Sequence, residues 1–374
     1  MFLEGKLLTA TTPCVPDTLS ATGAVNPGQL HAFLASLKHN NVLLVDGDRK
    51  VLTRLAKAVA PQIVGLPEAH QKAIEALVLA LPNLPTVVAL PFVPLSSSDK
   101  DGRAMIALVA RSVSSFGCDA VVTFPPVSAA SVRADIESLV REVVDVNDYT
   151  LSACERQRVQ FTELVALARR GREDVIRLIK CATRFSRTVT LYDRYLGTNM
   201  PGTAQSEDEH QRDLAANQRF ARSVAFFLQQ WREARGADSN HLKADVYTSV
   251  EAARFGDLSR AQHDEYCSGV RDWQRQVAAL SGVLVEVHLK ASHWKVPHDR
   301  YISTEQCTIA TPGGLDVIDV ARSPSQLDVV FSDFKNLQIV HGPDVPHELS
   351  RFEDAATAKD KLCHKLRFPP VTVT

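Results

Sequence analysis

The sequence predicts an α/β protein in which two α/β domains are joined by helices. Continuous apolar runs, such as NVLLVDGD at residues 41–48, are typical of strands that are covered on both faces in a parallel sheet. These runs alternate with amphipathic segments that predict helices, which is the pattern of α/β folds. The length of 374 residues exceeds what one hydrophobic core usually holds, so we expect two domains.

Composition indicates a globular protein that carries no strong overall charge. Hydrophobic residues make up 45% of the chain and charged residues 23%, and the formal net charge is −1. Binding to nucleic acid or to acidic phospholipid would therefore need a local basic patch. The seven cysteines lack paired zinc-binding spacing, which favours reduced thiols and a cytoplasmic location. The longest apolar run, residues 76–95, is broken by four prolines, so we expect no transmembrane segment.

The first predicted domain, residues 1–145, alternates strands and helices. We expect strands in the first ten residues, at 41–48, at 85–92 and at 119–123. Helices are expected at 27–38, 50–60 and 99–115. This order predicts a doubly wound parallel sheet, and Asp46 would stand at the carboxyl end of a strand, where such sheets place ligands.

Acidic residues occupy the ends of several of these elements. Asp46 and Asp48 follow a strand, Asp99 and Asp101 open a helix, and Asp119 opens the strand that ends at Thr123. The segment DKDGRAMIALVARSVSSFGCDAVVT, residues 99–123, resembles the PIN-like nucleases. The resemblance implies a nuclease that holds Mg²⁺ or Mn²⁺ on clustered carboxylates, which also position the attacking water. It implies catalytic roles for Asp46, Asp101 and Asp119, and metal ligands at Asp46, Asp48, Glu68, Asp101 and Asp119.

Simpler roles for the same acids remain open. Asp99 can cap a helix, Asp101 can complement the helix dipole, and Asp46-Gly47-Asp48 can form a turn. Phe124-Pro125-Pro126 stands where the PIN-like pattern has an acid after the threonine. A nuclease-derived scaffold without activity and an unrelated α/β domain are therefore alternatives to an active metal site.

Residues 146–183 predict connecting helices that are amphipathic and rich in arginine. Their basic face either is exposed to solvent or binds the phosphate groups of a ligand. The second predicted domain, residues 184–345, has expected strands at 187–196, 244–250 and 283–290 and helices at 220–235 and 259–282. We expect a loop at 198–218, and a helix at 354–367 within the tail, residues 346–374.

Four short motifs of the second domain occur in a distinctive order. They are Tyr192-Asp193-Arg194-Tyr195, His298-Asp299-Arg300, Gly314-Leu315-Asp316 and Ser332-Asp333-Phe334. Together they resemble the phospholipase-D-like domain that follows microtubule-interacting-and-transport modules, the MIT-C domain. The resemblance implies a phospholipase-D-like α/β fold without the catalytic motif and binding of acidic phospholipid. It implies that the ligand-binding residues are Asp193, Tyr195, Lys295, His298, Asp299, Arg300 and Asp316.

The residues themselves also argue against phosphodiester cleavage by this domain. A phospholipase D nucleophile needs His, Lys two positions later and Asp five positions after that. His288 and Lys290 are followed by Lys295, and His293 and Lys295 are followed by Arg300. Asp193 or Asp316 could instead orient Arg300, which would leave His298 and Lys295 to face an anion. A buried network in which these groups satisfy one another is the alternative.

Two functions follow as hypotheses. The first is a two-domain intracellular protein, of the kind found in bacterial defence, that pairs a PIN-like metal-dependent nuclease with a non-catalytic phosphate-binding module. The second is a non-enzymatic adaptor that binds acidic phospholipid, nucleic acid or a protein complex. A protein partner or a homo-oligomer is compatible with both.

Overall fold

A computed structural model describes most of the chain. The described residues are 9–17, 24–37, 41–84, 86–112, 118–136, 139–153, 155–156, 176, 179–180, 182–196, 200, 202, 204, 206–236, 242–251, 256–292, 300–305, 307–311, 318–320, 329–331, 338–341, 367–369 and 371. The chain divides into two compact units: the first is 1–163 with 341–343, and the second is 164–340 with 344–374. Each unit contains helices and a sheet, which confirms the predicted α/β class.

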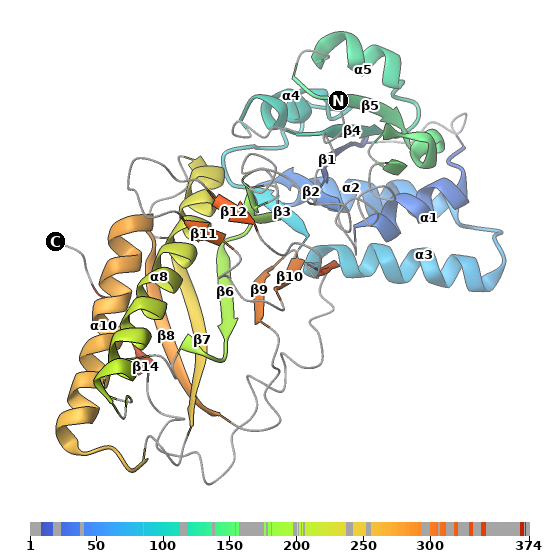
Figure 1. Ribbon diagram of the computed structural model, residues 1–374. Coiled ribbons are helices and arrows are strands. Elements are labelled where there is room, and N and C mark those ends of the chain that lie inside the picture. Colours follow the sequence, from blue (N-terminus) through green and yellow to red (C-terminus); the bar gives the residue numbers. More distant parts are fainter. Residues whose placement is uncertain are drawn as a thin grey trace. The chain divides into compact units, whose positions relative to one another are not determined.

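The first unit is built on a five-stranded sheet in which every strand pair is parallel (Figure 1). The strand order is β3-β2-β1-β4-β5. The strands are β1 (Thr9–Cys14), β2 (Asn41–Asp46), β3 (Val87–Leu90), β4 (Ala120–Thr123) and β5 (Glu142–Asp145). All of β2 is buried, as its continuous apolar run predicts. The order is that of a doubly wound sheet. Strands β2 and β3 are added on one side of β1 and strands β4 and β5 on the other, so the point where the strand order changes direction lies between β1 and β4.

In the described part of the first unit, five α-helices connect these strands. They are α1 (Pro27–Ser36), α2 (Lys50–Val59), α3 (Glu68–Ala80), α4 (Arg103–Ser112) and α5 (Ala129–Ile136), with 3₁₀ turns η1 (Ala60–Gln62), η2 (Leu81–Asn83) and η3 (Val146–Leu151). The side chain of Asn26 accepts hydrogen bonds from the backbone of Gly28 and Gln29, which caps α1 at the predicted start. Helix α1 packs against α3 and η3, and α4 packs against α5.

The second unit is built on a seven-stranded mixed sheet with the order β13-β10-β9-β6-β7-β8-β14. Its strands are β6 (Thr188–Asp193), β7 (Lys243–Glu251), β8 (Leu284–Ser292), β9 (Arg300–Thr304), β10 (Cys307–Thr311), β13 (Gln338–His341) and β14 (Arg367–Phe368). Strands β6, β7 and β8 are parallel, while β9 runs antiparallel to β6. A separate antiparallel pair joins β11 (Ile318–Val320) to β12 (Val329–Phe331). Arg367, expected to end a helix, lies instead in β14; residues 354–366 of that expected helix are outside the described part.

Two long helices, α8 (Glu207–Arg235) and α10 (Arg260–Ser281), pack against each other beside the parallel strands (Figure 1). Alternate residues of the strands, including Leu191, Val246 and Val287, are buried and form the apolar face. A Ser259–Gln262 capping box starts α10. Gly282 at φ 70° ends the helix, as the sequence predicts.

Helix α8 begins earlier than the sequence analysis expected. The predicted loop at 198–218 is wrong from residue 207 onward, where the chain is already helical. Ser206 accepts a hydrogen bond from the backbone of Glu209, and three acidic residues occupy the first turn. A serine cap and acids at a helix N-terminus stabilise a helix even when its outer face is wholly polar.

Among the described residues, no helix combines the length and the apolar character that crossing a membrane would need.

Candidate functional site

The carboxylates expected to form a metal site in the first unit are not brought together. Asp46 ends β2 at the carboxyl edge of the sheet, whereas Asp119 precedes β4 at the amino edge. There the Asp119 carboxylate accepts a hydrogen bond from the backbone of Ala10 at 2.8 Å. Ala10 is level with Val42, four residues before Asp46, which corresponds to about 13 Å along a strand. One ion cannot bridge these two carboxylates.

Asp46 caps a helix. Its Oδ2 accepts a hydrogen bond from the backbone of Lys50 at 2.9 Å, and its Oδ1 accepts one from Val51 at 2.8 Å. The side chain is fully buried. Two backbone N–H groups at the start of α2 are thereby satisfied, which is the role that an N-terminal capping carboxylate has.

The other expected acids are engaged in the same local manner. Asp99 accepts hydrogen bonds from the backbone of Ala104 and Met105, so it caps α4, although that helix begins at residue 103 and not at 99. Three acids form ion pairs with neighbouring cations: Asp48 with Lys50, Glu68 with Lys72 and Asp101 with Arg103. No three of these acids place their ligand atoms together in the part of the chain that the structure describes.

The carboxyl edge between β1 and β4, where doubly wound sheets bind ligands, is filled by the chain itself. The thiol of Cys14 donates a hydrogen bond to the carbonyl of Asp101 at 3.1 Å. Burial, with a further contribution from the charge of Asp101, raises the pKa of Cys14 to about 12, so its thiol stays protonated. Gly102 has φ +82°, and a Cβ there would lie 3.3 Å from the carbonyl oxygen of Val15. This close approach covers the edge with backbone.

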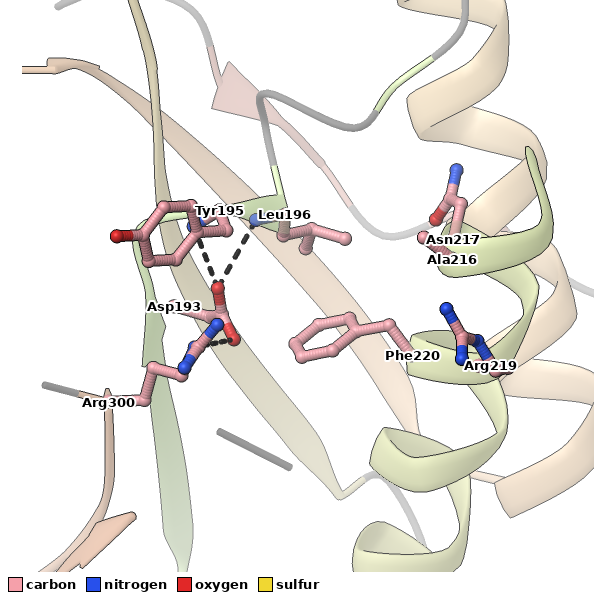
Figure 2. A pocket seen from close by; sticks show the side chains of 8 residues that line it. All are labelled: Asp193, Tyr195, Leu196, Ala216, Asn217, Arg219, Phe220 and Arg300. Carbon is pink, nitrogen blue, oxygen red and sulfur yellow. Dashed lines mark hydrogen bonds and ion pairs between the residues drawn. The ribbon is translucent and has the colours of Figure 1, made fainter. Parts of the chain in front are cut away.

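A pocket in the second unit gathers three of the residues predicted to bind ligand. It lies between the end of β6, the start of β9 and helix α8 (Figure 2). The lining residues are Asp193, Tyr195, Leu196, Ala216, Asn217, Arg219, Phe220 and Arg300. Its volume is about 40 Å³. One water molecule needs about 10–15 Å³ on this scale, so there is room for a few waters or one small oxyanion.

Arg300 is held in place on two sides. Its Nε lies 3.1 Å from Oδ2 of Asp193, and the two side chains are 16% and 5% exposed. The guanidinium carbon also lies 4.8 Å from the centre of the Tyr195 ring. An ion pair and a cation–π contact together restrict the rotamers of the arginine, which reduces the entropy lost when it binds an anion.

Asp193 is itself fixed by the backbone. Its Oδ1 accepts hydrogen bonds from the N–H groups of Tyr195 at 2.8 Å and Leu196 at 3.2 Å (Figure 2). One carboxylate oxygen therefore shapes the turn after β6, and the other pairs with Arg300. Of the two partners that the sequence offered for Arg300, Asp193 is the one observed. Lys295, His298, Asp299 and Asp316 lie outside the described residues.

The helix side of the pocket was not predicted. Asn217, Arg219 and Phe220 fall in or next to the stretch expected to be a loop, so no role was assigned to them. Asn217 and Phe220 are three positions apart and both buried, a helical spacing that could have identified this wall. Phe220 stacks on Trp273 of α10 with ring centres 6.0 Å apart, which anchors the wall to the core.

A second cluster lies on β7 and β8, where Asp245, Glu286 and His288 could hold a metal ion. Their ligand atoms lie within 4.8 Å of one another. His288 Nε2 lies 2.8 Å from Oδ1 of Asp245 and 3.6 Å from Oε1 of Glu286. Lys243 Nζ lies 2.6 Å from Oε2 of the buried Glu286, so an ammonium group already neutralises part of the cluster.

The sheet orients this cluster. Tyr192, Tyr247 and His288 are level on adjacent strands, and their rings stack with centre distances of 5.3 Å and 4.5 Å. Burial alone would raise the pKa of Asp245, but the hydrogen bond with His288 and the charge of Lys243 outweigh it and hold the pKa below its usual value. The carboxylate is therefore kept ionised, as a metal ligand must be.

No model of a known protein family matches this chain, and a search of curated proteins finds no relative.

Proposed function

We propose that the second unit is a non-catalytic module that binds a phosphate-bearing ligand in the pocket between β6, β9 and α8. One observation carries the proposal. The Arg300 guanidinium is held by Asp193 and by the Tyr195 ring, and it lines a small pocket together with Arg219.

The charges of the pocket favour an anion. Arg219 and Arg300 contribute two positive charges and Asp193 one negative charge, which leaves a formal charge of +1. A guanidinium has five N–H donors in a planar fork, a geometry that suits the oxygens of a phosphate group. Phosphate oxygens that can accept these hydrogen bonds occur in lipid headgroups, nucleic acids and small phosphorylated molecules.

Binding is better supported than cleavage. The second unit lacks the histidine–lysine–aspartate spacing of a phospholipase D nucleophile. In the first unit, Asp46 and Asp119 lie at opposite edges of the sheet and both accept backbone hydrogen bonds. The adaptor hypothesis therefore fits the geometry better than the nuclease hypothesis.

Isothermal titration calorimetry with inorganic phosphate tests the proposal. We expect wild-type protein to bind, and both Arg300→Ala and Arg219→Ala to lower the affinity about tenfold or more, since each removes charged hydrogen bonds. Arg212→Ala is the matched control, because Arg212 is exposed on α8 two turns away and does not line the pocket. No phosphate binding by the wild type, or equal losses in all three variants, would disprove the proposal.

A divalent cation is a second candidate ligand, favoured by the grouping of Asp245, Glu286 and His288. We propose that this group takes Zn²⁺ or Mn²⁺ in preference to Mg²⁺, because one of its three donors is an imidazole and Mg²⁺ prefers oxygen ligands. Binding would displace the ammonium of Lys243 from Glu286.

A further inference from the structure

We propose that His263 and Cys267 on α10 bind Zn²⁺, or a cation of similar chemistry, through an imidazole nitrogen and a thiolate sulfur. These are donors that Zn²⁺ favours, whereas Mg²⁺ and Ca²⁺ prefer oxygen ligands. The site goes beyond the proposed function. It shares no residue with the pocket between β6, β9 and α8 or with the cluster on β7 and β8.

The two donor atoms already lie at the spacing of a zinc site. Sγ of Cys267 is 3.7 Å from Nδ1 of His263. A tetrahedral Zn²⁺ ion holds nitrogen at about 2.0–2.1 Å and sulfur at about 2.3 Å, which places the two ligand atoms about 3.6 Å apart. One ion can therefore bind both side chains with little movement of either, so little conformational entropy is lost on binding.

Helix α10 maintains this spacing. Residues four apart lie on the same side of an α-helix, and the backbone N–H of His263 donates to the carbonyl of Ser259 at 2.9 Å, so His263 belongs to the regular helix. Tyr266 and Val270 are buried and anchor the helix to the core. His263 and Cys267 are partly exposed, as a site that takes an ion from solvent requires.

The charge state of the thiol agrees with a metal ligand better than with a reactive cysteine. Burial raises the pKa of Cys267, the charge of Arg271 lowers it, and the charge of Asp264 raises it further. A thiol that stays protonated is a poor nucleophile. A bound cation stabilises the thiolate instead, so the ion replaces the thiol proton, which is released to solvent.

Cys267 differs from the other two cysteines whose surroundings the structure describes. Cys14 and Cys118 are buried, and both thiols donate to backbone carbonyl groups. The thiol of Cys267 instead faces an imidazole four residues away on the same helix. This pairing makes Cys267 the candidate ligand among the three.

Absorption spectroscopy with Co²⁺ tests the proposal. Co²⁺ binds the nitrogen and sulfur ligands of Zn²⁺ sites with lower affinity than Zn²⁺. A Co²⁺–thiolate bond gives an ultraviolet charge-transfer band that carboxylate and imidazole ligands do not give, so the band distinguishes this site from the cluster on β7 and β8. We expect the reduced full-length protein to develop the band as Co²⁺ is added and to lose it when Zn²⁺ displaces Co²⁺.

Three substitutions assign the band. Cys267→Ser should abolish it, and His263→Ala should lower the Co²⁺ affinity about tenfold or more, because one protein ligand is lost. His210→Ala is the matched control and should leave the affinity unchanged. His210 is also partly exposed and also lies four residues after the serine that caps a long helix, but the residue four positions later is Leu214.

Alkylation of the wild type gives a second readout that needs no variant. Zn²⁺ should slow the reaction of Cys267 with iodoacetamide, followed by mass spectrometry of the peptide that contains it, because a metal-bound sulfur is a weaker nucleophile than a free thiolate. An unchanged alkylation rate, no charge-transfer band, or a band that persists in Cys267→Ser would overturn the proposal. Equal losses of affinity in His263→Ala and His210→Ala would also overturn it, because the site would then lack its nitrogen ligand.

Discussion

Asp193 and Arg300 face each other across two antiparallel strands, with Oδ2 of the aspartate 3.1 Å from Nε of the arginine. The register of β6 and β9 explains the contact: Tyr192 pairs with Tyr301, and continuing the same register by one residue places Asp193 opposite Arg300. Strand pairing therefore brings together two residues that are far apart in the sequence. Opposite charges directly across strands stabilise a sheet, and here they also define one wall of the pocket.

Replacing Asp193 should destabilise the second unit. Asp193→Asn removes the charge that pairs with the half-buried Arg300, and we expect the free energy of unfolding to fall by about 3 kcal/mol. Chemical denaturation measures the change. Asp272→Asn is the control, because Asp272 forms an exposed pair with Arg275 on α10, worth under about 1 kcal/mol. If both substitutions lower the free energy of unfolding equally, the Asp193–Arg300 pair stabilises the protein no more than an exposed ion pair does.

Asp46→Ala tests whether this residue caps a helix or binds metal. Loss of two hydrogen bonds to the start of α2 should cost about 1–2 kcal/mol of stability, with or without added Mn²⁺. Asp48→Ala, which removes an exposed carboxylate two residues away, should change stability by less than about 0.5 kcal/mol. The capping role would be refuted by Mn²⁺-dependent cleavage of labelled RNA that Asp46→Asn abolishes without loss of stability.

The cluster on β7 and β8 predicts metal binding that competes with a lysine. Calorimetric titration with Mn²⁺ should show one site, and His288→Ala should weaken it about tenfold or more. Lys243→Met should bind the ion more tightly than wild type, because no ammonium has to leave Glu286. Metal affinity that is unchanged by either substitution would place the ion elsewhere.

The pKa of Asp245 predicts how the second unit responds to acid. Because the folded-state pKa lies below the unfolded value, the ionised carboxylate stabilises the fold above the unfolded pKa of about 3.9. That stabilisation is lost as the pH falls through the folded-state pKa. Melting temperatures measured between pH 7 and pH 3 should therefore fall less steeply at the acid end in Asp245→Asn than in wild type. Parallel curves would mean that Asp245 contributes nothing to the pH dependence.

The apolar pattern of the sequence predicts much of the fold. Buried strands such as β2 and β6 and the core positions of α8 follow from hydrophobic runs and helical spacing, because burial of apolar surface dominates folding. Helical spacing within the expected helix at 220–235 places Val224, Phe227, Leu228 and Trp231 on one face, and all four are buried. Where the pattern is weak, the prediction failed: the polar first turns of α8 were expected to be a loop, and β5 and α5 were not expected.

The candidate site was harder to predict, because it depends on the end of the sheet at which each residue lies. Asp46 and Asp119 both flank strands, and only the parallel register shows that they lie at opposite ends. Long-range pairing of this kind cannot be read from residue spacing.

The stacking of Phe220 on Trp273 gives the pocket an intrinsic optical reporter. Phe220 lines the pocket, while the indole of Trp273 is buried directly behind it on α10. A bound molecule that shifts the phenyl ring changes the packing around the indole, on which its emission spectrum depends. Occupancy of the pocket should thus be visible in the fluorescence of the unlabelled protein.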